Sequence, residues 1–301
     1  MTVDYGAQGF TDILVSLDGG VAVVTLNRPK QRNTFAGTMP QEIVTVFDLL
    51  DRDDRVRVVV LTANPAAPAF CSGADLNNGW KSMFAHSPVE TEGLRAHRDT
   101  GGKVTMAIFR CRKITIAAVN GHAVGVGVTG FQLPCDFRFV WAGAKLALPF
   151  VRRGISAEAG SSYLLPRLLG HAKATALLLT GGTFTPDSPL LQGLYHQILP
   201  TRDAVFPAAL AFAQDLAANT SQTAIASTKA LLWHGADSIE EQHILESRVL
   251  AELASSGDAA EGALAFKERR PVRFVDILGK NLTDWVPWWR PVDVTYHRTK
   301  L

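Results

Sequence analysis

The sequence predicts an α/β fold from residue 13 to about residue 202, followed by a helical region. Strand-like apolar runs alternate with segments whose apolar residues recur at helical spacing, which is typical of a layered α/β core. From about residue 203 only helical patterns follow. The 301 residues are 47% hydrophobic and 19% charged, and this balance favours a globular protein with a sizeable core.

The first predicted elements are a β-hairpin, a helix and a buried strand. Residues 13–17 and 21–26 are apolar runs around an Asp-Gly-Gly turn, which is a hairpin pattern. The pair Thr38-x-x-Gln41 forms a capping-box pattern ahead of apolar residues at helical spacing, so a helix is expected to start there. Residues 55–63 form the next apolar run.

The later elements follow the same logic. Strands are expected over 113–119, 137–141 and 145–148, and a helix over 172–180 that ends at a Gly-Gly pair. Helices are expected over 204–218, 222–234 and 239–254, and one more from a second capping-box pattern at Asp258-x-x-Glu261. We therefore divide the chain into a core (1–202), a helical region (203–270) and a tail (271–301) whose tryptophans dock on the neighbouring layer.

Bulk properties exclude several classes of function. The net charge of +2 argues against nucleic acid as the main partner. No run of 18 apolar residues is present, so no membrane span is expected. The first ten residues lack the pattern of a secretory signal. The three cysteines show no metal-ligand spacing, which predicts reduced thiols and no metal site.

Residues 115–163 carry the clearest chemical pattern. An apolar strand enters a turn with Gly121, Gly125 and Gly127, where backbone can approach a ligand closely because glycine has no Cβ. A turn that feeds a helix presents unpaired N–H groups, which suit a developing oxyanion. Glu158 is the only carboxylate between positions 137 and 186, so it is the expected acid–base partner of this turn.

The same turn contains a G-x-G-x-x-G pattern at 125–130, which alone is a weak dinucleotide-binding signal. Dinucleotide binding also requires an acid about 20 residues further on, at the end of the next strand. Residues 145–151 contain no acid. The pattern therefore disfavours a dinucleotide site.

Five short motifs occur in one order across residues 13–200. They are Leu26-Asn27-Arg28-Pro29, Ala69-Phe70-Cys71-Ser72-Gly73-Ala74-Asp75-Leu76, Ala117-Ala118-Val119-Asn120-Gly121, Cys135-Asp136 and Leu165-Pro166-Arg167-Leu168-Leu169-Gly170. In this order they resemble the crotonase (enoyl-CoA hydratase/isomerase) superfamily.

That resemblance implies a spiral of ββα units with a C-terminal helical layer that builds a homotrimer or homohexamer. It also implies an acyl-CoA substrate, with coenzyme A as part of the substrate and no separate cofactor. The backbone N–H groups of Ala74 and Val126 would bind the thioester oxygen. The residues implied to bind substrate are Ser72, Gly73, Ala74, Asp75, Leu76, Gly125 and Val126.

Within the superfamily that the chain resembles, the positions of the acidic residues decide which reaction is expected. Hydratases of this superfamily have two glutamates, whose positions here hold Thr129 and Phe150. The segment 149–163 instead resembles the peroxisomal Δ3,Δ2-enoyl-CoA isomerases, with Glu158 at the position of their single catalytic glutamate. An isomerase that shifts the double bond from position 3 to position 2 is the main prediction.

Three alternatives stay open. The first is a divergent enoyl-CoA hydratase-like enzyme of a biosynthetic pathway. The second is a non-catalytic CoA-binding or scaffold protein, because a fold does not fix a function. The third concerns Glu158 alone, which could cap the helix that starts near Gly160.

The last three residues, Thr299-Lys300-Leu301, resemble the Ser-Lys-Leu peroxisomal address. The sequence therefore predicts a peroxisomal protein that binds the import receptor through this tripeptide.

Overall fold

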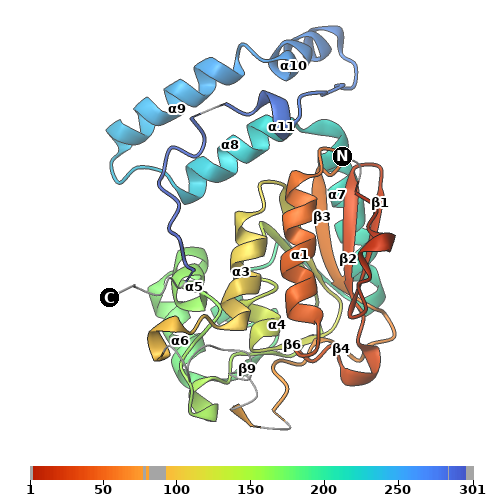
Figure 1. Cartoon of the computed structure of the whole chain (residues 1–301), viewed down its shortest axis with the longest axis vertical. Helices are drawn as coiled ribbons and strands as arrows, with labels where there is room; N and C mark the ends of the chain where they lie inside the picture. Colours follow the sequence, from red (N-terminus) through yellow and green to blue (C-terminus); the bar gives the residue numbers. More distant parts are fainter. Residues whose placement is uncertain (1–2, 77–78, 81–92, 284, 296–301) are drawn as a thin grey trace.

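The computed structural model describes residues 3–76, 79–80, 93–283 and 285–295. It has an α/β body with a layer of helices across one end (Figure 1). The predicted α/β class is therefore confirmed. The polar, glycine-containing residues 77–104 predict a helix plus a mobile segment near the acyl pocket, and most of residues 77–92 lie outside the described residues.

The main sheet has six strands in the order β1-β2-β3-β5-β7-β10. Their bounds are β1 Ile13–Asp18, β2 Val21–Leu26, β3 Val58–Ala63, β5 Ile114–Val119, β7 Phe137–Trp141 and β10 Gln197–Leu199. The predicted hairpin is confirmed, because β1 and β2 pair antiparallel with Asp18 opposite Val21. The other pairs are parallel. Strands β3 and β5 are buried along their whole length, which explains their continuous apolar sequences.

A smaller sheet positions the functional turns. It has four strands in the order β4-β6-β8-β9, with bounds β4 Ala69–Cys71, β6 His122–Val124, β8 Leu146–Ala147 and β9 Thr183–Phe184. Because β4 and β6 are neighbouring parallel strands, the loops that follow them leave the same edge of the sheet.

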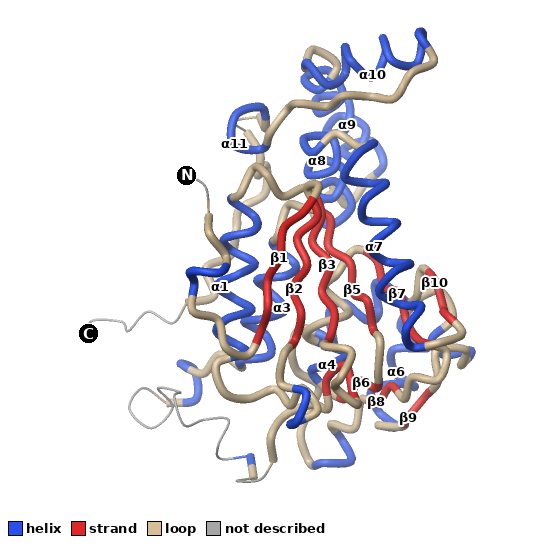
Figure 2. The backbone as a smooth tube through the Cα atoms, turned by 90° about the vertical axis from the view of Figure 1, so that its right-hand side faces the viewer, coloured by secondary structure: helices blue, strands red, loops and turns tan. Residues whose placement is uncertain are grey.

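Helices cover both faces of the main sheet. Figure 2 shows α1 (Met39–Arg52) and α3 (Thr100–Arg110) on one face and α7 (Arg202–Asn219) on the other. The apolar side chains accordingly form two clusters, one on each side of the sheet. Among the described residues, the body also contains α4 (Val126–Thr129), α5 (Ser161–Leu169) and α6 (His171–Thr180), with 3-10 turns at Gly6–Gln8, Pro29–Gln31, Leu94–Ala96, Val151–Arg153 and Pro189–Leu191.

The capping box predicted at Thr38 and Gln41 is wrong. The Thr38 side chain makes no cap hydrogen bond. Instead, Asp12 Oδ2 accepts hydrogen bonds from the backbone N–H groups of Thr38 at 2.9 Å and Met39 at 3.1 Å. A carboxylate far away in the sequence thus satisfies the free donors of α1, which no local pattern could reveal.

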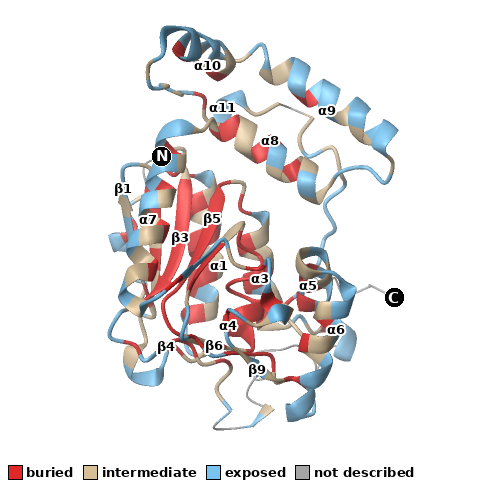
Figure 3. Cartoon of the chain, turned by 180° about the vertical axis from the view of Figure 1, so that it is seen from behind, coloured by how far each residue is buried: buried red, intermediate tan, exposed pale blue. Residues whose placement is uncertain are grey.

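The helical region contains α8 (Gln222–Trp233), α9 (Ile239–Leu253), α10 (Gly257–Glu268) and α11 (Leu278–Asn281). Much of the surface of α9 and α10 is exposed in Figure 3. The second predicted capping box is also wrong, because Ser256 caps α10. Asp258 Oδ1 instead accepts the N–H groups of Val275 at 2.7 Å and Asp276 at 3.0 Å, and so holds the start of the tail.

The prediction that the tail tryptophans dock on the neighbouring layer is confirmed. Trp288 Nε1 donates to the carbonyl of His234 at 2.7 Å, and Trp289 stacks on the His234 ring with centroids 3.8 Å apart. Farther along, Arg98 Nε donates to the carbonyl of Val294 at 2.5 Å. Within the described part of the chain, no helix is long and apolar enough to cross a membrane.

Candidate active site

Two loops at the edge of the smaller sheet are packed closely enough to form one site. Gly73, after β4, has a φ of +90°, and a Cβ there would lie 3.1 Å from the carbonyl oxygen of Val124. Gly127, after β6, approaches from the other side, and its Cβ would lie 2.7 Å from the carbonyl oxygen of Cys71. Glycine at both positions lets the two backbones come together.

This packing brings the predicted oxyanion donors into one region. Val126 is the first residue of α4, so its N–H has no partner within the helix. Beside Ala74, the N–H of Phe35 donates to the carbonyl of Gly73 at 2.8 Å. Among the described residues, the N–H groups of Ala74 and Val126 donate to no protein acceptor. Their placement agrees with an oxyanion role, which stays a prediction.

Glu158 points toward the same turn. The hydroxyl of the fully buried Thr129 donates to Glu158 Oε1 at 3.0 Å and lies 3.2 Å from the carbonyl oxygen of Gly125. The loop that carries Glu158 is fixed to α3, because Thr105 Oγ1 donates to the carbonyl of Ala159 at 2.9 Å. The structure thus joins Glu158 to the glycine turn, as the sequence predicts.

The alternative role for Glu158 as a helix cap is wrong. Helix α5 starts at Ser161 after Gly160, and no side chain caps it. The backbone carbonyl of Glu158, rather than its carboxylate, accepts the N–H of Ser161 at 3.1 Å. The carboxylate instead accepts a hydrogen bond from Thr129 and lies against Gly101.

The surroundings of Glu158 raise its pKa to about 7. Burial is the main cause because it disfavours the charged form, and the negative charge and hydrogen bond of Asp99 act in the same direction. The hydrogen bond from Thr129 lowers the pKa and partly offsets these effects. A carboxyl group that titrates near neutral pH can both accept and return a proton.

Replacement of Thr129 by Val tests this hydrogen bond. Thr129→Val removes the donor and leaves a side chain of similar size, so the pKa of Glu158 should rise above about 7. Any pH-dependent step that needs the ionised carboxylate should then move to higher pH. The pH profile of kcat/KM measures this, and a profile that does not move would show that the hydrogen bond has no effect on the reacting group.

The two positions of the hydratase glutamates hold residues that cannot replace them. Thr129 binds Glu158, as described above. Phe150 is buried, and its ring lies 3.8 Å from the place that a Cβ on Gly125 would occupy. An apolar ring therefore borders the turn where the second glutamate is expected.

Asp99 is the site residue that sequence reasoning missed. It lies at the N-terminus of α3, where its side chain accepts the N–H of Gly102 as a helix cap. Its sequence pattern, an acid just before a run of small and apolar residues, predicts only the cap. Its contact with Glu158 arises from the packing of α3 against the loop before α5.

The predicted substrate loop is partly accessible. Ser72 Oγ lies 3.1 Å from Thr34 Oγ1, Gly73 is buried, and Leu76 is 41% exposed. Ala74 and Asp75 are half-buried, whereas Gly125 and Val126 are buried. The role of these residues in binding coenzyme A stays a prediction.

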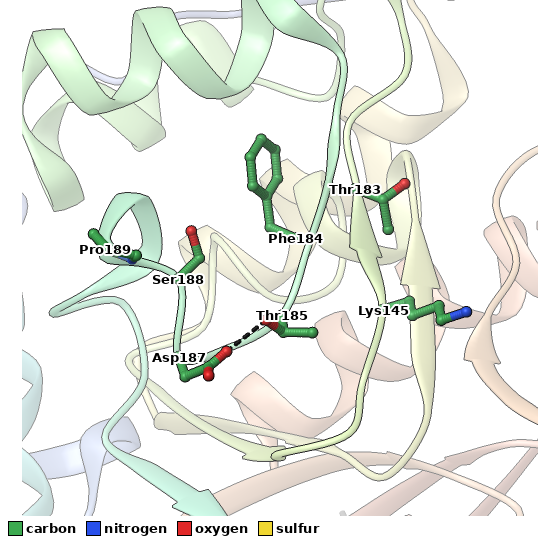
Figure 4. Close-up of a pocket in the computed structure, with 7 residues that line it drawn as sticks. All are labelled: Lys145, Thr183, Phe184, Thr185, Asp187, Ser188 and Pro189. Atoms are coloured by element: carbon green, nitrogen blue, oxygen red, sulfur yellow. Dashed lines mark hydrogen bonds between the residues drawn. The ribbon is translucent and has the colours of Figure 1, made fainter.

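Two surface cavities lie elsewhere. The larger, of about 780 Å³, is shown in Figure 4 and is lined by Lys145, Thr183, Phe184, Thr185, Asp187, Ser188 and Pro189. The second, of about 350 Å³, lies beside it and shares Asp187 and Pro189. Neither is lined by Glu158, Ala74 or Val126, so we place the chemistry at the glycine turn rather than in these cavities.

The fold and the glycine turn are typical of one family of enzymes. The chain belongs to the enoyl-CoA hydratase/isomerase family, whose sequence model matches residues 16–277. The predicted family and fold are therefore confirmed.

Similar proteins cover most of the chain. The chain is 40% identical to the enoyl-CoA hydratase AFT3-1 of Alternaria alternata over 86% of its length and 84% of that protein. It is 32% identical to the mevalonyl-coenzyme A hydratase SIDH of Beauveria bassiana, over 84% of this chain and 90% of that protein. A solved structure of a probable enoyl-CoA hydratase/isomerase from Mycobacterium abscessus is 38% identical with a TM-score of 0.73, and the match covers 88% of this chain and 98% of that one.

Proposed function

We propose that this chain is an enoyl-CoA hydratase-like enzyme in which Glu158 carries the proton. The observation that supports this proposal is the half-buried Glu158 carboxyl beside the glycine turn, with a pKa raised to about 7. The two curated relatives described above are both named hydratases. Those names favour hydration over the isomerisation that the sequence pattern alone predicts.

One carboxylate is chemically sufficient for the addition of water. Ionised Glu158 accepts a proton from water while the water oxygen forms a bond to C3 of the 2-enoyl thioester. The C2–C3 π electrons move toward the thioester oxygen, where the N–H groups of Ala74 and Val126 stabilise the enolate. Protonated Glu158 then gives the same proton to C2. No electrons are exchanged with a cofactor, and coenzyme A is part of the substrate.

Isomerisation is the second candidate because Thr129 and Phe150 occupy the positions of the hydratase glutamates. In that reaction, ionised Glu158 takes the α-proton of a 3-enoyl thioester and returns it to the γ-carbon. The intermediate is a dienolate rather than a hydroxy enolate, and the same N–H groups stabilise its oxygen. Both reactions start from the ionised form of Glu158.

Product identification separates these candidates. The purified protein is incubated with 2-enoyl-CoA and 3-enoyl-CoA in water enriched in oxygen-18, and the products are identified by mass spectrometry. We expect a 3-hydroxyacyl-CoA that contains one oxygen-18 atom. Conversion of 3-enoyl-CoA to 2-enoyl-CoA without oxygen-18 would support the isomerase instead. Binding of both thioesters without any product would support a scaffold and contradict an enzyme.

We also propose a homotrimer or homohexamer. Apolar side chains on α8 and α9 are largely exposed in the single chain: Leu232 (79%), Ile239 (79%), Ile244 (71%) and Leu250 (70%). Large apolar side chains exposed on neighbouring helices are typical of an interface between subunits.

We propose peroxisomal import through Thr299-Lys300-Leu301, because this tripeptide is similar to a known peroxisomal address. A fluorescent protein fused to the N-terminus is expected to give punctate cellular fluorescence that coincides with a peroxisomal marker. Deletion of residues 299–301 should make it diffuse, because such signals are read by a receptor. Punctate fluorescence that survives the deletion would exclude the tripeptide as the address.

A further inference from the structure

We propose that Asp99 is a positioning residue of Glu158: both carboxyl groups lie at the first turn of α3, and Asp99 accepts a hydrogen bond from Glu158 when Glu158 holds the transferred proton. This inference rests on the proposed function, because it assigns Asp99 a role in the proton transfer by Glu158. It concerns a second carboxyl group that lies outside the positions of the hydratase glutamates.

Two contacts place both carboxyl groups at the first turn of α3. The side chain of Asp99 caps α3 by accepting the N–H of Gly102. Glu158 Oε2 lies against Gly101, in the same helical turn, so closely that a Cβ at Gly101 would collide with it. Both side chains therefore lie at the first turn of α3, where the negative charge of Asp99 acts on Glu158.

Both groups are held in this arrangement by their backbones. Thr105, one turn farther along α3, ties the Glu158 loop to the helix through the carbonyl of Ala159 at 2.9 Å. The residue before Asp99 is fixed by the tail, since Arg98 Nε donates to the carbonyl of Val294. The contact is therefore part of the packing of α3 and does not depend on two flexible surface chains.

Neighbouring carboxylates repel each other when both are charged, so Glu158 holds its proton to a higher pH beside Asp99 than it would alone. The charged group that acts on Glu158 among the described residues is Asp99, and the only other polar influence is the uncharged hydroxyl of Thr129 on α4. Burial and Asp99 together raise the pKa of Glu158 to about 7.

This pairing makes Glu158 a stronger base at the moment that it reacts. When ionised Glu158 accepts a proton from water or from the α-carbon, the new O–H group can donate to the carboxylate of Asp99. That hydrogen bond stabilises the protonated intermediate until the proton passes to carbon. The pair ends the cycle with the same number of protons, and no co-reactant is consumed.

The test removes the charge of Asp99 and keeps the cap. Asp99→Asn retains a good N-cap residue, and Asp99→Ser retains a shorter cap that cannot reach Glu158. Asp12→Asn is a matched control, because Asp12 accepts the first N–H groups of α1 and is not a partner of Glu158. The carboxyl carbon of Glu158 is followed by carbon-13 NMR across pH 5–9, with Glu158→Gln to assign the signal.

We expect both Asp99 variants to lower the midpoint of the Glu158 titration by about one pH unit, because a like charge is removed. The acidic limb of kcat/KM should move to lower pH by the same amount. In the pH-independent range, kcat should fall by about threefold to tenfold, because a weaker base transfers the proton more slowly. KM should change little, and Asp12→Asn should behave as the parent.

A Glu158 titration that is unchanged in both Asp99 variants would overturn the inference, even if the enzyme is active. The NMR measurement needs no substrate, so it separates this inference from the proposed function. A lowered midpoint without any turnover of enoyl-CoA would uphold the carboxyl pair and contradict the proposed function.

Discussion

Glu158→Gln is expected to lower kcat by about 100- to 10,000-fold, the usual contribution of a general base. The amide keeps the shape and the contact with Thr129 but cannot accept a proton at neutral pH. Binding of acyl-CoA should change little, because the oxyanion N–H groups are unaffected. Steady-state kinetics with the turned-over enoyl-CoA, together with calorimetric binding, measure both quantities.

The expected loss of kcat in Glu158→Gln should not result from unfolding. The pKa of Glu158 is raised from the ordinary range of a glutamate to about 7, so the carboxyl group favours the folded state at low pH. This stabilisation is lost as the pH rises through about 7. The amide that replaces this carboxyl group in the variant Glu158→Gln does not titrate. The free energy of unfolding of this variant should therefore rise relative to that of the parent as the pH increases toward about 7. Glu240→Gln, on the exposed first turn of α9, is the matched control. Activity of Glu158→Gln within about threefold of the parent would place the base elsewhere.

Gly101→Ala should give the second largest effect. A Cβ at this position would collide with Glu158 Oε2 and approach the Cβ of Ala159 at 3.2 Å. Alanine is more favourable than glycine inside a helix, and the end of the Glu158 side chain can move. The protein should therefore fold while its carboxyl group is displaced. We expect kcat to fall by about 10- to 100-fold, because a shift of about 1 Å in a catalytic group has effects of this size.

A second glycine-to-alanine change distinguishes displacement of the Glu158 carboxyl group from a general effect of alanine in a helix. Gly262 lies inside α10, where a Cβ would lie 3.6 Å from the Phe274 ring, an ordinary packing distance. Gly262→Ala should leave kcat unchanged. Equal kinetics for Gly101→Ala and Gly262→Ala would show that the contact between α3 and Glu158 has no part in catalysis.

The strands and helices could be predicted because their signals are local. The sequence interval 137–141 coincides with β7, and α6 ends at a left-handed Gly181 as its Gly-Gly pair predicts. The two capping boxes could not be predicted correctly. The carboxylate that serves α1 is Asp12, which comes from another part of the chain, and Asp258 binds the tail instead of its own helix start.

In the candidate site, too, the features with local sequence signals could be predicted, and the contacts between distant segments could not. Glu158 stood out because it is the only acid in a long apolar and glycine-rich stretch, and its contact with Thr129 follows from the turn. Asp99 shows only a cap pattern, and its contact with Glu158 exists because Thr105 holds the loop against α3. The direction of the pKa shift of Glu158 could not be predicted from the sequence either. Burial raises this pKa and the hydrogen bond from Thr129 lowers it, and only the structure shows that burial has the larger effect.

The pH dependence of kcat/KM tests most directly whether Glu158 carries the proton, because this ratio reports the pKa of the free enzyme's reacting groups. Both candidate reactions start from ionised Glu158. We therefore predict that kcat/KM rises with pH and levels off above an inflection near pH 7, the value to which burial and Asp99 raise this pKa. The inflection should be absent from the residual activity of Glu158→Gln. A flat profile for the parent between about pH 5 and 9, or an inflection that survives in Glu158→Gln, would contradict Glu158 as the proton carrier.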